Sequence, residues 1–161
     1  MGAADQRFFD MLRAAHFPPE RNYLAAHITL FHQLPPSCLG ELDGLIRRIA
    51  ADTPPPAARL RELYSLGKGV AYRIDSPGLL AIRARIADHF TGMLTAQDQG
   101  TPRLHITIQN KVTAPEACAL LADLARDFVP RPLTIDGLAA HHYRGGPWDA
   151  AFARNFRGRR T

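Results

Sequence analysis

The fold and function of this chain are indicated by two short stretches, 26-AHITL-30 and 104-LHITI-108. Both alternate apolar residues with a histidine and then a threonine, a pattern that predicts half-buried β-strands over 23–31 and 103–109. Successive side chains of a strand point to opposite faces, so each histidine shares a face with the threonine two residues later. Random order would give about 0.1 such tetrapeptides in a chain of this composition. The pair therefore favours two halves of one active site over two ordinary strands with stray polar residues.

The rest of the chain divides into helix and strand signals separated by proline and glycine turns. Ser76-Pro77 and 113-TAPE-116 mark two helix starts, because a Ser or Thr cap accepts hydrogen bonds from the first free backbone amides. The sequence 67-GKG-69 predicts a hairpin turn. Outside the motif strands, the predicted helices are 5–16, 39–49, 76–90 and 113–128, and the predicted strands are 60–66, 70–74, 133–143 and 148–152.

The two halves of the chain repeat one order of elements. In each, a motif strand is followed by a proline-marked turn, a capped helix and further strands. Strict β-α-β alternation is absent, so we expect the α+β class, with mainly antiparallel sheets and flanking helices. We expect a single domain over 1–161 with two pseudo-symmetric lobes, which contribute the motif strands 23–31 and 103–109. A pseudo-twofold arrangement would bring the two motif faces together across a central groove.

The composition is that of an ordinary globular protein. Hydrophobic residues make up 46% and charged residues 22% of the 161 residues, and no apolar run approaches the ~18 residues of a membrane span. The first residues lack a signal-peptide core, so the expected location is the cytoplasm. The formal charge is +5, and of 20 basic residues only Lys68 and Lys111 are lysines. The planar guanidinium group of arginine suits phosphate, which would favour an anionic ligand. An arginine-rich genome would explain the excess of arginine over lysine equally well.

The paired motifs, 78 residues apart, closely resemble those of the two-histidine (HxTx) phosphoesterases, the group that contains bacterial 2′-5′ RNA ligase and RNA 2′,3′-cyclic phosphodiesterase. The stretches 8-FFD-10, 16-HFPPERN-22 and 143-YRGGPW-148 resemble a bacterial branch of that group. The resemblance implies a bilobal α+β fold with a solvent-filled groove that holds both histidines and no metal. Members usually open with an apolar strand, whereas here a helix follows 1-MGAA-4, so one lobe's sheet is expected to lack an edge strand.

The motif residues suit the opening of a cyclic phosphate. A base must deprotonate water and an acid must protonate the departing ribose oxygen. Histidine, with an ordinary pKa near ~6.5, can serve as either near neutral pH. We therefore expect His27 and His105 to act as the acid–base pair, in an order that the sequence leaves open. The hydroxyls of Thr29 and Thr107 can donate to the phosphate oxygens as charge develops.

Three further residues are candidates for substrate binding. Gln109 shares the parity of His105 and could contact the phosphate or a base, or it could be a solvated polar residue of the groove. Arg103 flanks the same strand and could add positive potential, although a solvated charge needs no function. Tyr143 could stack on a nucleobase or ribose. The alternative is that Tyr143 packs against Trp148 across a hairpin.

The remaining histidines do not predict a metal site. The adjacent pair 141-HH-142 would point to opposite faces of a strand and could not chelate one ion, and no cysteine or carboxylate lies at zinc-finger or HExxH spacing. Walker, dinucleotide and G-x-S-x-G fingerprints are also absent from the sequence. We expect no metal and no cofactor.

The prediction is a cyclic phosphodiesterase that acts on RNA 3′ ends or small cyclic nucleotide phosphates, with 2′-5′ ligation as the reverse reaction. One alternative is a non-catalytic RNA or nucleotide-phosphate binding module that uses the same groove. Another is a scaffolding domain that would tolerate loss of both histidines. No membrane partner is expected, and the chain is expected to be a monomer. The sequence does not identify the substrate.

Overall fold

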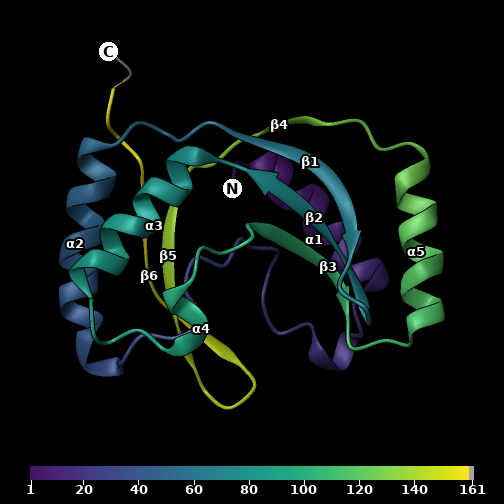
Figure 1. The fold of residues 1–161 in the computed structure, drawn as a ribbon, viewed down its shortest axis with the longest axis horizontal. Coiled ribbons are helices and arrows are strands. Elements are labelled where there is room, and N and C mark those ends of the chain that lie inside the picture. Colours follow the sequence, from purple (N-terminus) through teal and green to yellow (C-terminus); the bar gives the residue numbers. More distant parts are fainter. Residues whose placement is uncertain (160–161) are drawn as a thin grey trace.

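The structure, a computed structural model, describes residues 1–159 and shows two lobes side by side (Figure 1). The α-helices are α1 (Ala3–His16), α2 (Leu39–Asp52), α3 (Pro77–His89), α4 (Ala96–Gln99) and α5 (Ala114–Arg126). The strands are β1 (Ala58–Ser65), β2 (Gly69–Asp75), β3 (His105–Asn110), β4 (Arg131–Leu133), β5 (Gly137–Tyr143) and β6 (Trp148–Asn155). Two 3₁₀ turns, η1 (Pro19–Arg21) and η2 (Pro36–Cys38), complete the list. The predicted α+β class with antiparallel sheets is confirmed.

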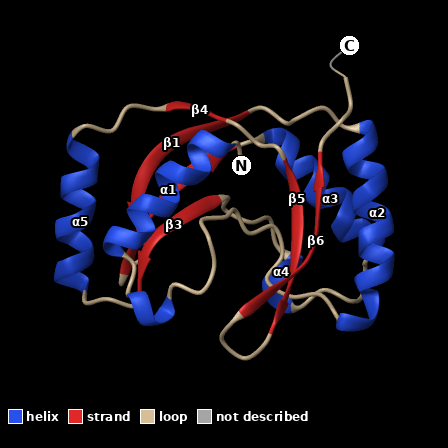
Figure 2. Cartoon of the chain, turned by 180° about the vertical axis from the view of Figure 1, so that it is seen from behind, coloured by secondary structure: helices blue, strands red, loops and turns tan. Residues whose placement is uncertain are grey.

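The larger lobe is a four-stranded antiparallel sheet in the order β3-β2-β1-β4. Helices α1 and α5 pack against it (Figure 2). Tyr72 of β2 is the centre of this packing: its ring meets the edge of Phe9 from α1 at a centroid distance of 5.4 Å and of Phe128, just after α5, at 5.5 Å. Phe9 is fully buried and Tyr72 nearly so, and such burial contributes about 2 kcal/mol per side chain.

The smaller lobe has only two strands, the antiparallel hairpin β5–β6, with α2 packed against it and α3 beside α2 (Figure 1). Leu42, Leu45, Ile46 and Ile49 form the buried stripe of α2. The two sheets are therefore unequal, with four strands in one and two in the other. No helix within residues 1–159 is long and apolar enough to cross a bilayer.

The two helix starts predicted from capping residues are confirmed at atomic detail, whereas α1 begins at Ala3, two residues before the predicted start. Ser76 caps α3, since its hydroxyl accepts a hydrogen bond from the Leu79 amide at 3.2 Å. Thr113 and Glu116 form the predicted capping box at the start of α5, where the Thr113 amide donates to the Glu116 carboxylate at 2.8 Å. The 67-GKG-69 turn joins β1 to β2, and Gly67 has φ +82°, a conformation that favours glycine.

Two predicted strands are corrected. The segment 23–31 belongs to neither sheet, and bends at Leu24, Ala26 and Leu30 interrupt it. The segment 133–143, predicted as one strand, is divided between β4, which pairs with β1, and β5, which pairs with β6. The intervening residues 134–136 carry the chain from one lobe to the other, which a continuous strand could not do.

Candidate active site between the two lobes

The second motif lies on β3, at the edge of the larger sheet. His105 is the cross-strand neighbour of Arg73, and Thr107 is the neighbour of Ala71. Ile106 pairs with Tyr72 and is fully buried. Side chains alternate along a strand, so His105 and Thr107 share the face opposite to the core, as predicted.

Gln109 does not share that face. Gln109 pairs with Val70 and Thr107 pairs with Ala71, which are adjacent residues of β2, so β3 carries one extra residue at a β-bulge. The bulge reverses the alternation, and both Ile108 and Gln109 are buried. The prediction that Gln109 faces the groove beside His105 is therefore wrong. Its side-chain oxygen has no hydrogen-bond partner in the described chain.

The first motif lies on the irregular segment 23–34, which we call the first-motif segment. Within residues 1–159, no backbone–backbone hydrogen bond involves it. Side chains of α1 bind its backbone instead. The Ala26 amide donates to Oδ1 of Asp10 at 2.7 Å, and the Ala26 carbonyl accepts from Nε2 of Gln6 at 2.9 Å. Ala26 is 4% exposed, so these side chains satisfy groups that would otherwise be buried without partners.

The other end of the first-motif segment is bound by α3 and α4. Nε of Arg83 donates to the Leu30 carbonyl at 3.2 Å. The buried carboxylate of Asp98 accepts from the amides of His32 and Gln33 at about 3.0 Å and from Nδ1 of His32 at 2.9 Å. Desolvation raises the pKa of Asp98, but the hydrogen bonds from His32 and Gln33 outweigh it, so the pKa lies below its ordinary value.

Arg13 of α1 connects the two motifs. Its Nη1 donates to the Thr107 carbonyl at 2.8 Å, and its Nη2 donates to Oδ1 of Asn22 at 2.7 Å, just before the first-motif segment. The guanidinium also lies over the Phe17 ring, 4.2 Å from its centroid. Arg13 is 5% exposed, and this burial lowers its pKa. A single buried cation thus ties the backbone of β3 to the start of the other motif.

The two motif histidines are anchored in the same way. Nδ1 of His27 lies 2.8 Å from the Ala25 carbonyl, and Nδ1 of His105 lies 2.7 Å from the Arg103 carbonyl, in each case two residues earlier. A carbonyl only accepts hydrogen bonds, so Nδ1 carries a proton in both rings. Nε2 of each ring has no hydrogen bond to the described protein. Each Nε2 is therefore the atom that can take up or release a proton.

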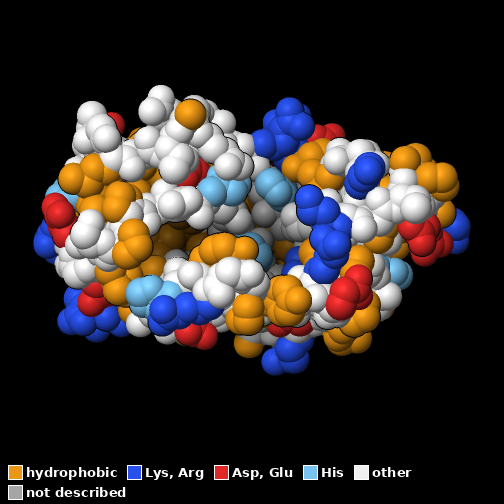
Figure 3. Space-filling model, turned by 90° about the horizontal axis from the view of Figure 1, so that it is seen from below, with side chains coloured by type: hydrophobic (Ala, Val, Ile, Leu, Met, Phe, Trp, Pro, Cys, Tyr) orange, Lys and Arg blue, Asp and Glu red, His pale blue; other side chains and the backbone are white. Residues whose placement is uncertain are grey.

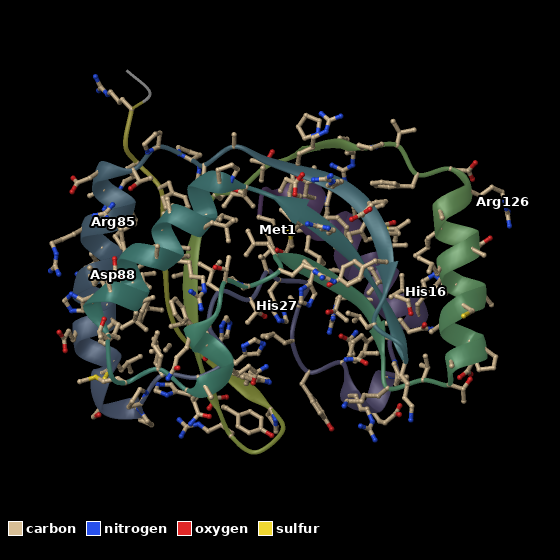
Figure 4. All side chains as sticks on the ribbon, in the orientation of Figure 1. Met1, His16, His27, Arg85, Asp88 and Arg126 are labelled. Carbon is tan, nitrogen blue, oxygen red and sulfur yellow. The ribbon has the colours of Figure 1, made fainter. Side chains whose placement is uncertain are left out.

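His27 lies at the centre of the molecule, between the lobes, whereas His16 lies far from it at the end of α1 (Figure 4). Desolvation is the main cause that lowers the pKa of His27, and the Ala25 carbonyl opposes it. Charge repulsion from Arg13, and from His141 and His105 when these rings are protonated, lowers the pKa further. Figure 3 shows histidine side chains around a hollow between the lobes. His141 of β5 is thus a third histidine close enough to act on His27.

The motif threonines are available to a ligand. Thr29 and Thr107 are both half-buried, and neither hydroxyl forms a hydrogen bond within the part of the chain that the structure describes. A half-buried hydroxyl without a protein partner keeps its donor free. Beside each open Nε2 there is therefore a free hydroxyl on the same segment.

The other two residues predicted to bind substrate contact aromatic rings of the protein. Tyr143 pairs with Trp148 across the β5–β6 hairpin, with ring centroids 4.9 Å apart, so the packing alternative holds. Tyr143 remains 63% exposed. The Arg103 guanidinium lies over the Tyr64 ring at 5.6 Å, and the Tyr64 ring meets the edge of His105 at 6.1 Å.

Sequence reasoning missed Arg13, Asp10 and Asp98, because nothing local indicates that these side chains bind a distant backbone. From the sequence, His141 was considered only as a metal ligand. Its position on the predicted second hairpin was the signal that could have indicated a place near the site. Among residues 1–159, no three His, Cys, Asp or Glu side chains converge as a metal site requires.

Comparison with known proteins agrees with the geometry. The profile of the 2′-5′ RNA ligase superfamily matches residues 2–147. No curated protein sequence matches the chain. The crystal structure of TT0787 from Thermus thermophilus superposes with a TM-score of 0.62 over 99% of this chain and 96% of that one, at 14% identity, which shows a shared fold. The match over nearly the whole chain confirms the resemblance seen in the motifs. This chain belongs to the 2′-5′ RNA ligase superfamily.

Proposed function

We propose that the chain hydrolyses 2′,3′-cyclic phosphates with His27 and His105 as the acid–base pair. The observation that carries the proposal is the equivalent anchoring of the two rings: each donates from Nδ1 to the carbonyl two residues earlier and leaves Nε2 open. A site that only bound an anion would not need two histidines anchored in this way, because arginine side chains would bind the anion. Membership of a phosphoesterase superfamily points to the same chemistry.

In the proposed reaction, one neutral Nε2 takes a proton from water as the water oxygen bonds to phosphorus. The bond from phosphorus to one ribose oxygen breaks, and the other, protonated Nε2 gives that oxygen a proton. Ligation uses the same two roles with a 5′-hydroxyl in place of water. The 5′ oxygen bonds to phosphorus as its proton goes to the neutral Nε2, and the bond to the 3′ oxygen breaks as that oxygen takes a proton from the other Nε2, which leaves a 2′-5′ phosphodiester. The hydroxyls of Thr29 and Thr107 donate to the non-bridging oxygens, whose charge grows in the transition state.

The proposed function requires no metal, and its substrates are RNA 3′ ends or small cyclic nucleotide phosphates. The test is turnover of a nucleoside 2′,3′-cyclic phosphate in EDTA. His27→Ala and His105→Ala should each lower kcat by about 10² or more, since a placed acid or base contributes 10²–10⁴. His16→Ala is the matched control, because His16 lies far from His27, and it should keep full activity (Figure 4).

Turnover that survives both substitutions contradicts the proposal. Binding of the cyclic nucleotide without product would instead favour a non-catalytic nucleotide-phosphate binding module. Loss of turnover in EDTA, with recovery on adding a divalent cation, would contradict the metal-independent mechanism.

A further inference from the structure

A basic hollow lies next to the second motif, whose Leu104 lines it. A cavity of about 300 Å³ lies between the end of β2, the first turn of α3 and the chain entering β3. Arg61, Arg73 and Arg103 line it, with Asp75 as the single carboxylate on its wall. Three guanidinium groups against one carboxylate give the cavity a net positive charge, which favours an anion.

The cavity's arginines remain available to a ligand. Arg61 pairs with Asp75 and Arg73 with Glu62, each at 3.1 Å. Both pairs are open to solvent, and exposed pairs are worth only about 0–1 kcal/mol, so a phosphate can compete with them. Arg103 pairs with no carboxylate among residues 1–159 and lies over Tyr64.

The cavity adjoins the second motif directly. Arg73 is the cross-strand neighbour of His105, so their side chains lie side by side on one face. Arg103 precedes His105 by two residues, and its own carbonyl anchors the His105 ring. Tyr64 contacts both Arg103 and the edge of His105. A ligand whose reacting phosphate is at His105 would therefore present its next anionic group to these arginines.

We propose that this cavity is a subsite for a second phosphate group of the substrate. The proposal rests on the proposed function, because it takes His105 as the position of the reacting phosphate. Guanidinium groups bind phosphate through paired, charge-assisted hydrogen bonds, and three of them converge here. The second phosphate is either the phosphodiester to the preceding nucleotide of an RNA end or the 5′-phosphate of a mononucleotide.

The experiment compares kcat/KM for three substrates. These are a nucleoside 2′,3′-cyclic phosphate, the same compound with a 5′-phosphate, and a dinucleotide that ends in the cyclic phosphate. The wild-type chain should prefer a substrate with a second phosphate by about tenfold, the value of one charge-assisted contact. Preference for the dinucleotide identifies the phosphodiester, and preference for the 5′-phosphorylated compound identifies the terminal phosphate.

Arg103→Gln should bring the ratio of kcat/KM values close to one, mainly through KM. Arg85→Gln is the matched control, because Arg85 of α3 lies on the outer side of the molecule and has no ion pair within the described residues (Figure 4). Arg61→Gln is the second variant if Arg103→Gln does not fold. The wild-type preference should also fall as salt rises, since phosphate contacts release counterions.

Equal kcat/KM for all three substrates in the wild-type chain overturns the subsite, as does a preference that Arg103→Gln and Arg85→Gln both retain. If the wild-type chain turns over none of the substrates, the proposed function fails instead. Binding of a dinucleotide 2′-phosphate, measured by calorimetry, then decides the subsite. Weakening by about tenfold in Arg103→Gln supports it, and unchanged binding contradicts it.

Discussion

The two motifs offer the same chemical groups but are held in different ways. His105 and Thr107 lie on β3, whose backbone is fixed by the ladder to β2. His27 and Thr29 lie on a segment outside both sheets, whose backbone binds side chains from α1, α3 and α4. Both arrangements present an open Nε2 beside a free hydroxyl. Duplicated chemistry therefore does not require duplicated backbone pairing.

In the first-motif segment, contacts with buried charged side chains replace the backbone hydrogen bonds that a neighbouring strand would make. Four charged residues of the described chain are buried, and three of them, Arg13, Arg83 and Asp98, bind in or beside the first-motif segment. A buried charge is costly unless it is hydrogen-bonded. Arg83 and Asp98 each make several hydrogen bonds, and Arg13 makes two, although its Nε has no partner in the described chain. The first motif should consequently be far more sensitive than the second to single substitutions at a distance.

The largest expected effect comes from Arg13→Met, which keeps much of the side-chain volume. The change removes donors to the Thr107 carbonyl and to Asn22, so the free energy of unfolding should fall by about 3 kcal/mol. Both motifs lose a support, so kcat/KM should fall by more than the loss of folded protein explains. Urea unfolding and a cyclic-phosphate assay measure the two quantities.

Arg126→Met is the control, since Arg126 is exposed on α5 and forms only a surface pair with Asp123. Its effect should stay within about 0.5 kcal/mol. Similar losses in the two variants would remove the basis for assigning Arg13 a role in holding the motifs.

The same comparison shows what the sequence can and cannot predict. Alternation in 26-AHITL-30 correctly predicted which side faces the core, since Ala26 is buried and Ile28 and Leu30 pack against the core. The alternation could not predict whether the segment pairs with a strand, because pairing depends on whether a partner strand lies alongside it. The bulge that buries Gln109 is a property of the pairing between β2 and β3 and is equally invisible in either strand alone.

Local interactions, in contrast, could be predicted closely. The Ser76 cap and the Thr113–Glu116 capping box each involve residues three apart, so the sequence contains both partners. The contacts of the first motif join residues far apart in the chain: 66 positions separate His32 from Asp98, and 94 separate Arg13 from Thr107. No sequence pattern encodes such pairs.

A smaller effect is expected from Asp98→Asn. The asparagine side chain keeps one oxygen that can accept from the backbone amides of His32 and Gln33, but it carries no charge. The free energy of unfolding should therefore fall by about 2 kcal/mol. Asp123→Asn, on the exposed face of α5, should change stability by no more than about 0.5 kcal/mol. Equal effects would show that Asp98 does not hold the segment.

The contribution of Asp98 also has a pH dependence with a fixed sign. Its pKa is lower in the folded chain than the unfolded value of ~3.9. The stability it contributes is therefore present above that unfolded value and lost as the pH falls through the folded pKa. Asp98→Asn should flatten this acid limb of a stability–pH curve, whereas Asp123→Asn should leave it in place.

The smallest effect is a shift in the titration of His27 without loss of stability. Charge repulsion from the His141 ring is one of the causes that lower the pKa of His27, so His141→Gln should move that pKa upward, towards its ordinary value. NMR titration of the His27 ring measures the shift. His142→Gln is the matched control: His142 is the next residue on β5 and is not among the charges that act on His27.

An unchanged titration in His141→Gln, or an equal shift in both variants, would show that β5 does not set the protonation of the first motif. An upward shift confined to His141→Gln would show that this strand, which forms no ladder with the first motif, still acts on its chemistry through charge.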